Sequence, residues 1–192
     1  MKHAILRVSG TFGSGKTTAA RDFLKYPHEA LEKGGKIQGY QIDASSAGIA
    51  APIFLLGSYK NTCGGCDGIP TQAEIAERAL KAHPHGHVLM EGALLSGSGM
   101  GGAVTIAVEP TGCGVYTFLN TPLEECITRV KIRRAAAGNE KPFDPKNLIK
   151  KFESVVDCYH NMKRAGCDTR LVDYTDIHQP LLNILKEFES DE

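Results

Sequence analysis

Short apolar segments and longer amphipathic segments alternate along the chain, and this alternation predicts strands and helices in turn. Buried strands are expected at residues 4–8, 36–43, 53–56, 87–91, 115–119 and 171–173. Helices are expected at residues 15–25, 71–82, 121–134, 144–164 and 177–188. Residues 99–108 fit neither pattern alone, because their glycines oppose a helix while the later residues suit one. Strands that alternate with helices predict a three-layer α/β/α fold built on a mainly parallel sheet.

The starts of two predicted helices contain the same capping signal. Thr71 and Glu74 form one capping box, and Thr121 and Glu124 form the other, with a proline at the first helical position. In such a box the threonine hydroxyl accepts a hydrogen bond from a free backbone amide of the first turn. We therefore expect helices to begin beside Thr71 and Thr121.

The length and the charge of the chain limit its architecture and its partners. A chain of 192 residues suits one compact domain spanning residues 1–192, and the sequence contains no linker, repeat or low-complexity tract that would divide it. Acidic and basic residues balance at 22 each, so the total charge indicates neither a polyanionic partner nor a membrane surface. With no signal-peptide segment and no membrane-spanning apolar run, we expect a cytoplasmic protein with reduced thiols. The sequence does not indicate the oligomeric state.

A phosphate-binding motif lies between the first predicted strand and the first predicted helix. Gly10 to Thr17 match the pattern G-x-x-x-x-G-K-[ST] in the structural context that this motif requires. The glycines allow successive backbone amides to converge on anionic phosphates, Lys16 would bridge the β- and γ-phosphates, and the Thr17 hydroxyl would bind Mg²⁺. The motif predicts a site for a nucleoside triphosphate made of Gly10, Thr11, Phe12, Gly13, Ser14, Gly15, Lys16, Thr17 and Thr18.

A glycine-rich surface turn is the alternative interpretation of this motif, and the flanking strand and helix argue against it. Hydrolytic P-loop proteins such as GTPases and motors are the competing functional class. They usually exceed this length or contain an Asp-x-x-Gly switch or an Asn-Lys-x-Asp base reader, and neither motif occurs in this sequence. The pattern therefore favours a phosphotransferase with the P-loop NTPase fold of nucleoside monophosphate kinases and a short lid.

Arginines gather on the helix predicted at residues 121–134. Arg129 and Arg133 lie one helical turn apart and share a face, with Arg134 next to them. Guanidinium groups that approach a transferring phosphoryl group spread its developing negative charge, and a mobile lid excludes competing water. A solvated basic face would show the same spacing. Because a phosphate loop is present and residues 135–143 interrupt the helical pattern, we expect a lid at residues 129–146 with Arg129 and Arg133 as catalytic groups.

Two carboxylates at the ends of predicted strands are candidates for acceptor chemistry. Asp43 ends one strand and Glu91 ends another. The carboxyl ends of parallel strands open onto the ligand crevice, so both side chains are expected to face the γ-phosphate. We assign Asp43 as the stronger candidate for the base. Glu91 is expected to belong to the coordination shell of Mg²⁺ with Thr17, or to be a partner of the base. The two roles could be exchanged, and either side chain could instead be an ordinary capping carboxylate.

A polar, glycine-dense loop at residues 58–68 contains Cys63 and Cys66 in a C-x-x-C arrangement. Such a pair is half of a zinc site, with the histidines at positions 83, 85 and 87 as partners, but no second C-x-x-C completes it. The histidines are two and four positions apart, and His87 begins a predicted strand. Redox chemistry is a further alternative. We favour a substrate loop in which an exposed Tyr59 stacks on a base and Asn61 and Asp67 hydrogen-bond to it. A plain structural turn fits almost as well.

Taken together, four segments resemble the phage 5-hydroxymethyluridine DNA kinases, which are P-loop kinases of thymidine hypermodification. The segments are S-G-T-F-G-S-G-K-T-T, G-S-Y-K-N-T-C-G-G-C-D-G-I-P-T-Q, V-L-M-E-G and N-T-P-L-E-E-C-I-T-R-V-K-I-R-R. The second segment is the specific one, since the other three recur across small kinases. The resemblance covers most of the chain, and it implies substrate contacts by Tyr59, Asn61, Asp67, Gln72 and Arg134.

The resemblance also implies a reaction. Such a kinase transfers the γ-phosphoryl group of ATP, with Mg²⁺, to the 5-hydroxymethyl group of 5-hydroxymethyluracil in double-stranded phage DNA, with Asp43 or Glu91 as the base. The 5-substituent projects into the major groove, where it would be reached without full base flipping. Residues 129–170 contain 11 Lys and Arg against 5 Asp and Glu, a basic stretch suited to DNA phosphates. A kinase of free nucleosides, nucleoside monophosphates or small metabolites is the second interpretation, and a non-enzymatic nucleotide-binding regulator is the third.

Overall fold

The computed structural model describes residues 2–60 and 64–190. The strands are β1 (Ile5–Ser9), β2 (His28–Lys33), β3 (Lys36–Ile42), β4 (Ile53–Leu56), β5 (His87–Glu91), β6 (Gly114–Leu119) and β7 (Thr169–Val172). The helices are α1 (Lys16–Asp22), α2 (Gln72–Ala82), α3 (Ala103–Val108), α4 (Leu123–Ala136), α5 (Lys146–Arg164) and α6 (His178–Ser190). The predicted alternation is confirmed except for β2, which the sequence pattern did not indicate.

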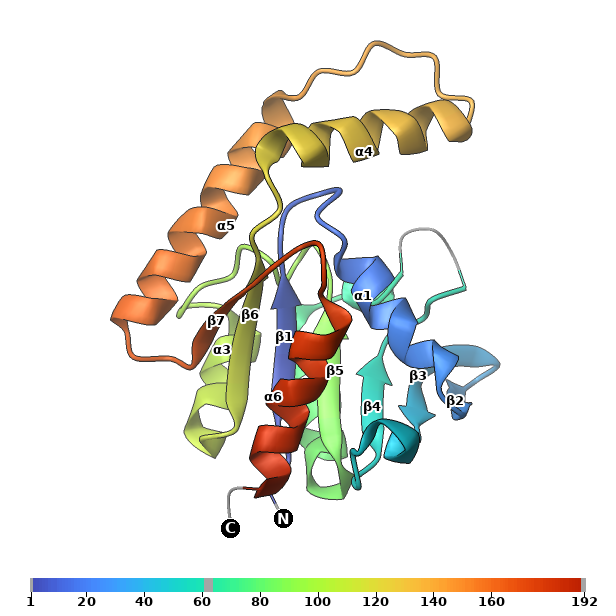
Figure 1. Ribbon diagram of the computed structural model, residues 1–192, viewed down its shortest axis with the longest axis vertical. Coiled ribbons are helices and arrows are strands. Elements are labelled where there is room, and N and C mark those ends of the chain that lie inside the picture. Colours follow the sequence, from blue (N-terminus) through green and yellow to red (C-terminus); the bar gives the residue numbers. More distant parts are fainter. Residues whose placement is uncertain (1, 61–63, 191–192) are drawn as a thin grey trace.

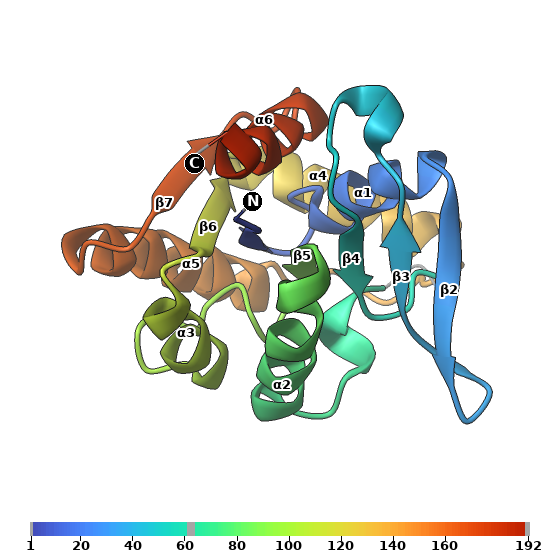
Figure 2. The same cartoon turned by 90° about the horizontal axis from the view of Figure 1, so that it is seen from below.

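The strands of the described residues form one seven-stranded sheet in the order β2-β3-β4-β5-β1-β6-β7. In this order, each strand of the run β4-β5-β1-β6-β7 is parallel to its neighbours. Helices α1 and α6 cover one face of the sheet, and α2, α3 and α5 cover the other (Figures 1 and 2). Apolar side chains of β1, β5 and β6 are buried at these two interfaces. The predicted three-layer α/β/α fold is therefore confirmed.

The hairpin of β2 and β3 is the main departure from the predicted fold. β2 pairs antiparallel with β3, and β3 pairs antiparallel with β4. Gly34 and Gly35 form the turn, both at positive φ (59° and 71°), which is the backbone geometry of a tight two-residue hairpin. β2 is exposed along nearly its whole length, so it lacks the alternating apolar pattern that predicts a strand. Because β3 runs opposite to the parallel strands, its carboxyl end lies at the other edge of the sheet from theirs.

The two predicted capping boxes have different outcomes. At the start of α2, the Thr71 hydroxyl accepts a hydrogen bond from the Glu74 amide at 3.1 Å, as predicted, while the Glu74 carboxylate pairs with Arg78. At the start of α4 the prediction is wrong, because the Thr121 hydroxyl donates to the carbonyl oxygen of Ser14 at 2.8 Å. Thr121 therefore ties the start of α4 to the phosphate loop instead of capping the helix.

The remaining predicted elements lie close to their expected positions. The helix in residues 99–108 begins only at Ala103, after the glycines. The predicted interruption corresponds to residues 137–145, between α4 and α5. None of the helices in the described part of the chain combines the length and the apolar composition that a bilayer crossing requires.

Candidate active site

The phosphate loop joins β1 to α1 at the carboxyl edge of the parallel strands (Figure 1). Gly13 and Gly15 adopt positive φ (79° and 105°), a conformation that glycine reaches without strain. Gly13 also packs against α4, where a Cβ atom would lie 2.6 Å from the carbonyl oxygen of Cys126. The loop therefore needs glycine both for its curvature and for its contact with the helix above it.

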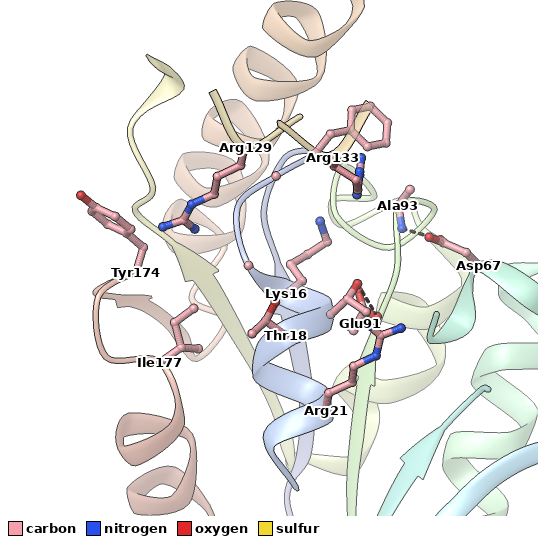
Figure 3. Close-up of a pocket in the computed structure, with 14 residues that line it drawn as sticks. Lys16, Thr18, Arg21, Asp67, Glu91, Ala93, Arg129, Arg133, Tyr174 and Ile177 are labelled. Atoms are coloured by element: carbon pink, nitrogen blue, oxygen red, sulfur yellow. Dashed lines mark hydrogen bonds between the residues drawn. The ribbon is translucent and has the colours of Figure 1, made fainter. Parts of the chain in front are cut away.

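A cavity of about 520 Å³ opens above the phosphate loop (Figure 3). Its walls come from the phosphate loop and α1, the segment after β5, one face of α4 and the turn before α6. Of the predicted nucleotide-binding residues, those that line the cavity are Phe12, Gly13, Gly15, Lys16, Thr17 and Thr18. Thr11 and Ser14 are buried and line a separate cavity between β6 and α5. The structure thus gathers most of the predicted nucleotide site around one cavity.

Lys16 is the first residue of α1 and lies at the floor of the cavity. Its side chain is 8% exposed, and Nζ donates to the carbonyl oxygens of Gly10 and Thr11, both at 2.9 Å. Burial lowers the pKa of Lys16, and the Glu91 carboxylate opposes this shift. A phosphate would be a stronger partner for the ammonium than two neutral carbonyls, because both groups would then be charged. The arrangement suits the capture of an anion by the loop.

Glu91 ends β5 and points into the same cavity (Figure 3). It is 1% exposed, and its Oε1 accepts a hydrogen bond from the Thr17 hydroxyl at 3.2 Å. Burial raises the pKa of Glu91 to about 7, while Lys16 and the Thr17 hydroxyl act in the opposite direction. Thr17 and Glu91 lie together as predicted, and they form an all-oxygen pair of the kind that Mg²⁺ prefers.

Arg129 and Arg133 reach the cavity from α4, on one face of the helix as their spacing predicts (Figure 3). The Nε atom of Arg129 pairs with Glu125 at 2.6 Å, and its guanidinium carbon lies 5.5 Å from the centre of the Tyr174 ring. Both arginines line the cavity opposite Lys16, so they are placed to approach an anion that the phosphate loop holds.

Comparison with known proteins places these features in a family. No family model matches the chain. A protein of Pseudomonas phage PaMx11 named 5-hmdU DNA kinase is 34% identical over 169 residues, which cover 86% of this chain and 88% of the relative. The chain belongs to the 5-hmdU DNA kinase family.

Two further proteins are similar to the chain at lower sequence identity. A second 5-hmdU DNA kinase, from Delftia phage PhiW-14, is 23% identical over 177 residues, which cover 84% of this chain and 65% of that relative. Among solved structures, a gluconokinase from Sinorhizobium meliloti 1021 is 19% identical, with a TM-score of 0.47 over 96% of this chain and 92% of its own. Membership of the 5-hmdU DNA kinase family makes the protein a phosphotransferase, and the cavity above the phosphate loop is its candidate active site.

Asp43 lies at the opposite edge of the sheet from the phosphate loop, so its prediction as the base is wrong. β3 ends beside Ile53, which pairs with His87 at the start of β5, whereas Glu91 ends β5. Asp43 is exposed, and its Oδ1 accepts a hydrogen bond from the Ser45 amide at 2.9 Å. The prediction assumed that β3 is parallel to β5. Asp43 is instead a capping carboxylate of a surface turn.

Tyr59 is 6% exposed, which contradicts the prediction that it is an exposed platform for a substrate base. Its ring packs against Tyr40, with the ring centres 6.2 Å apart. Burial raises the pKa of the Tyr59 hydroxyl, and the nearby Glu91 carboxylate adds to this shift. After Tyr59 the chain folds back, so that the Gly65 amide donates to the carbonyl of Ser58 at 2.9 Å. The Tyr59 ring therefore belongs to the core of the protein.

Arg134 turns away from the cavity, although we predicted a substrate contact for it. Its guanidinium donates to Oδ1 of Asn139 at 3.2 Å and to the carbonyl of Lys141 at 2.9 Å, and it lies 5.7 Å from the centre of the Phe143 ring. Successive residues of an α-helix point about 100° apart, which separates Arg134 from the direction of Arg133. Arg134 instead holds the segment between α4 and α5.

The other predicted substrate contacts lie in different places. Asn61 is outside the described residues. Gln72 begins α2, donates to the carbonyl of Leu94 at 2.9 Å and is not among the residues that line the cavity. Asp67 does line the cavity, and its Oδ1 accepts a hydrogen bond from the Ala93 amide at 2.6 Å (Figure 3). Asp67 is therefore the member of this set that the fold brings towards the phosphate loop.

The zinc and redox interpretations of the C-x-x-C pair do not fit Cys66. Cys63 lies outside the described residues. Cys66 is fully buried, and this burial raises the pKa of its thiol, which disfavours the thiolate that redox chemistry requires. His87 lies at the other end of β5, where Nδ1 accepts a hydrogen bond from the Ala4 amide at 2.9 Å. Within the described residues, no three His, Cys, Asp or Glu side chains gather closely enough to hold a metal ion by themselves.

The raised pKa of Glu91 predicts that the stability of the protein depends on pH. In the folded protein the carboxyl holds its proton up to about pH 7, whereas in the unfolded chain it ionises near the ordinary value of 4.5. The proton on Glu91 therefore stabilises the folded state. This contribution is complete below the unfolded pKa and is lost as the pH rises through the folded pKa. Relative to Glu91→Gln, the wild-type free energy of unfolding should fall by about 2 kcal/mol between about pH 5 and pH 8. Denaturant unfolding of both proteins without nucleotide measures this difference, and an equal pH dependence in the two would contradict the prediction.

Proposed function

We propose that the kinase transfers the γ-phosphoryl group of ATP, bound with Mg²⁺, to the 5-hydroxymethyl group of 5-hydroxymethyluracil in double-stranded DNA. Two phage relatives named 5-hmdU DNA kinase support this acceptor. The structural observation on which the proposal rests is the cavity in which Lys16, Thr17 and Glu91 face two arginines of α4. The phage origin of both relatives supports action in the cytoplasm of an infected bacterium.

The cavity offers partners for each part of the nucleotide. Loop amides and Lys16 would hold the phosphates, and Thr17 and Glu91 would hold Mg²⁺ together with phosphate oxygens. The metal, when bound, would neutralise charge on the β- and γ-phosphates. The nucleobase would lie against the ring of Tyr174, because aromatic rings stack on base faces. The volume of about 520 Å³ is within the range of small-molecule sites.

Arg129 and Arg133 would stabilise the phosphoryl group during its transfer. They line the cavity from α4, which lies over the phosphate loop (Figure 1). A phosphoryl group between Lys16 and these two side chains would be surrounded by positive charge on opposite sides. In a site that excludes water, such charges stabilise the transition state more strongly than they would in solution.

Positive charge on α4 supports a nucleic-acid acceptor. Helix α4 contains four basic side chains, Arg129, Lys131, Arg133 and Arg134, against two acidic ones, Glu124 and Glu125. Lys131 and Arg133 are exposed. Because the net charge of the whole chain is zero, attraction to DNA phosphates would come from this local excess. Such attraction weakens as salt replaces the released counterions, so binding to DNA should be salt-dependent.

Transfer from labelled ATP distinguishes the proposed acceptor from its alternatives. The protein is incubated with Mg²⁺, γ-labelled ATP and either a duplex containing 5-hydroxymethyluracil, the matching thymine duplex, or the free 5-hydroxymethyl nucleoside and its monophosphate. We expect label only in the modified duplex, with kcat/KM falling about tenfold or more between about 50 and 200 mM salt. Transfer to the free compounds with little salt dependence would instead show a small-molecule kinase. Labelled phosphate released without a labelled acceptor would show a nucleotide-hydrolysing regulator.

A further inference from the structure

Two carboxylates border the cavity, and their surroundings differ. Glu91 is 1% exposed and accepts the hydrogen bond of Thr17, so it belongs to the proposed metal side. Asp67 is exposed and lines the cavity from the loop that follows β4. A base must lie within hydrogen-bond reach of the proton that it removes. For an acceptor attached to a DNA strand, the exposed carboxylate meets this condition better than the buried one.

Gly65 and Cys66, the residues before Asp67, fix its position. Gly65, at φ 74°, packs on Glu91 so closely that a Cβ atom would lie 2.3 Å from Oε1. Cys66 is fully buried and anchors the next residue, Asp67, at the surface of the cavity. From the other side, a Cβ atom on Gly92 would lie 2.9 Å from Asp67 Oδ1. The loop and the end of β5 therefore pack closely together, and this contact places Asp67 at the wall of the cavity above the phosphate loop.

Ala93 is held through both of its backbone polar groups. Its amide donates to Oδ1 of Asp67 at 2.6 Å, and its carbonyl oxygen accepts a hydrogen bond from Lys151 Nζ at 2.9 Å. Lys151 belongs to α5, so this pair of bonds links the helix after the lid to the loop that contains Asp67. Gly97 leaves room for the ammonium, since a Cβ atom there would lie 2.9 Å from Nζ.

The second carboxylate oxygen of Asp67 is oriented by these contacts and remains available. The hydrogen bond from the Ala93 amide goes to Oδ1, and the other oxygen has no hydrogen-bond partner among the described residues. A carboxylate fixed through one oxygen presents the other in a defined direction. This is the arrangement that general base catalysis requires, in which the base is positioned before the substrate arrives.

We infer that Asp67 is the base of phosphoryl transfer and that Lys151 positions it through Ala93, an inference that rests on the proposed function. The acceptor hydroxyl donates a hydrogen bond to the second oxygen of Asp67. As the hydroxyl oxygen bonds to the γ-phosphorus, its proton passes to Asp67, and the bond from the γ-phosphorus to the oxygen bridging the β-phosphate breaks. The products are the phosphorylated DNA and ADP, and Asp67 then releases the proton to solvent.

Asp67→Asn tests the role of the carboxylate. Asparagine keeps an oxygen for the Ala93 amide, so the fold should be retained while the proton acceptor is lost. We expect kcat on the modified duplex to fall about 100-fold or more, with KM for ATP unchanged. Asp43→Asn is the matched control, because Asp43 is also exposed and also accepts a backbone amide, but at the opposite edge of the sheet. It should behave as wild type. Asp67→Ser repeats the test if the asparagine variant is unstable on heating.

The outcomes separate this inference from the proposed function. Wild-type protein that transfers nothing to the modified duplex would reject the proposed function itself. An active wild type together with an Asp67→Asn kcat within about threefold of it would reject Asp67 as the base. That second result would leave the proposed function standing.

Lys151→Met tests the positioning role. We expect kcat to fall about tenfold at unchanged KM for ATP, and Lys151→Arg to restore part of the loss, because arginine can donate to the same carbonyl. Lys81→Met, on an exposed residue of α2 outside the basic stretch, is the control and should be neutral. If Lys151 acts through Asp67, the double variant Asp67→Asn with Lys151→Met should be no slower than Asp67→Asn alone. Fully additive losses, or an unchanged kcat in Lys151→Met, would overturn the positioning role.

Discussion

Lys16→Met should reduce phosphoryl transfer to the modified duplex on the order of 10³-fold. Methionine keeps the length of the side chain but removes the ammonium that would contact the β- and γ-phosphates. Because negative charge moves between these phosphates as the bond breaks, we expect a larger loss in kcat than in ATP affinity. Single-turnover transfer from labelled ATP measures the first quantity, and calorimetric titration with ATP and Mg²⁺ measures the second.

Lys25→Met is the control for this substitution. Lys25 follows α1 by a few residues, and its side chain is 77% exposed, with an ion pair to Asp22 at 2.5 Å. An exposed pair of this kind contributes little, so activity and stability should stay close to wild type. If Lys16→Met transferred phosphate at a rate close to that of Lys25→Met, the assignment of the phosphate loop would be wrong.

Gly65→Ala should abolish most of the activity and also destabilise the fold. Gly65 has φ 74°, and an added Cβ atom would lie 2.3 Å from Oε1 and 2.8 Å from the carbonyl oxygen of Glu91. The clash involves backbone as well as side chain, so the loop, the end of β5 or both must move. A displacement of about 1 Å at a catalytic group costs on the order of 100-fold in rate, and we expect a loss of at least this size in kcat. The free energy of unfolding should fall by about 2 kcal/mol.

Gly68→Ala is the matched control in the same loop. An added Cβ atom on Gly68 would have nothing within 4 Å, and its φ lies outside the left-handed region. Thermal unfolding and transfer assays of both variants should therefore separate them clearly. Equal activities for Gly65→Ala and Gly68→Ala would show that the packing of the loop on Glu91 is not needed for catalysis.

The nucleotide side of the site is predictable from the sequence because its signals are local. The motif at residues 10–17 fixes the spacing of the groups on the phosphate loop. The spacing of Arg129 and Arg133 places both side chains on one face of a single helix. Glu91 ends a strongly apolar segment, and the carboxyl ends of parallel strands meet at one edge of a sheet. Each of these inferences depends on a few neighbouring residues or on the period of one element.

The acceptor side is not predictable in the same way, because it depends on strand direction and on the path of a loop. Asp43 is misplaced once β3 is assumed to be parallel, and the exposed strand β2 gives no pattern that would correct the assumption. Tyr59 turns inward and Asp67 reaches the cavity because the loop folds back between Ser58 and Gly65. Neither the composition nor the periodicity of the sequence predicts these two side-chain positions.

The contacts of Arg7 in the core are likewise not predictable from the sequence. It is fully buried in β1, where its guanidinium donates to the carbonyl of Ser98 at 2.9 Å and to the hydroxyl of Thr105 at 3.2 Å. The guanidinium carbon also lies 4.5 Å from the centre of the Tyr116 ring. A charged residue inside an apolar strand can be seen in the sequence, but its partners come from distant parts of the chain. Only the packed structure shows that Arg7 connects β1 to α3 and to the segment before it.

Mass spectrometry of the modified duplex tests most directly whether the loop around Lys16 delivers the terminal phosphoryl group of ATP to a hydroxymethyl oxygen. After reaction with ATP and Mg²⁺, the DNA is digested with nuclease and its nucleotides are fragmented. The account predicts a 5-hydroxymethyluracil nucleotide heavier by one phosphoryl group, with the added mass on the base, and no such product from the thymine duplex or from Lys16→Met. Consumption of ATP with unmodified bases, or a phosphoryl group found at a strand end, would contradict it.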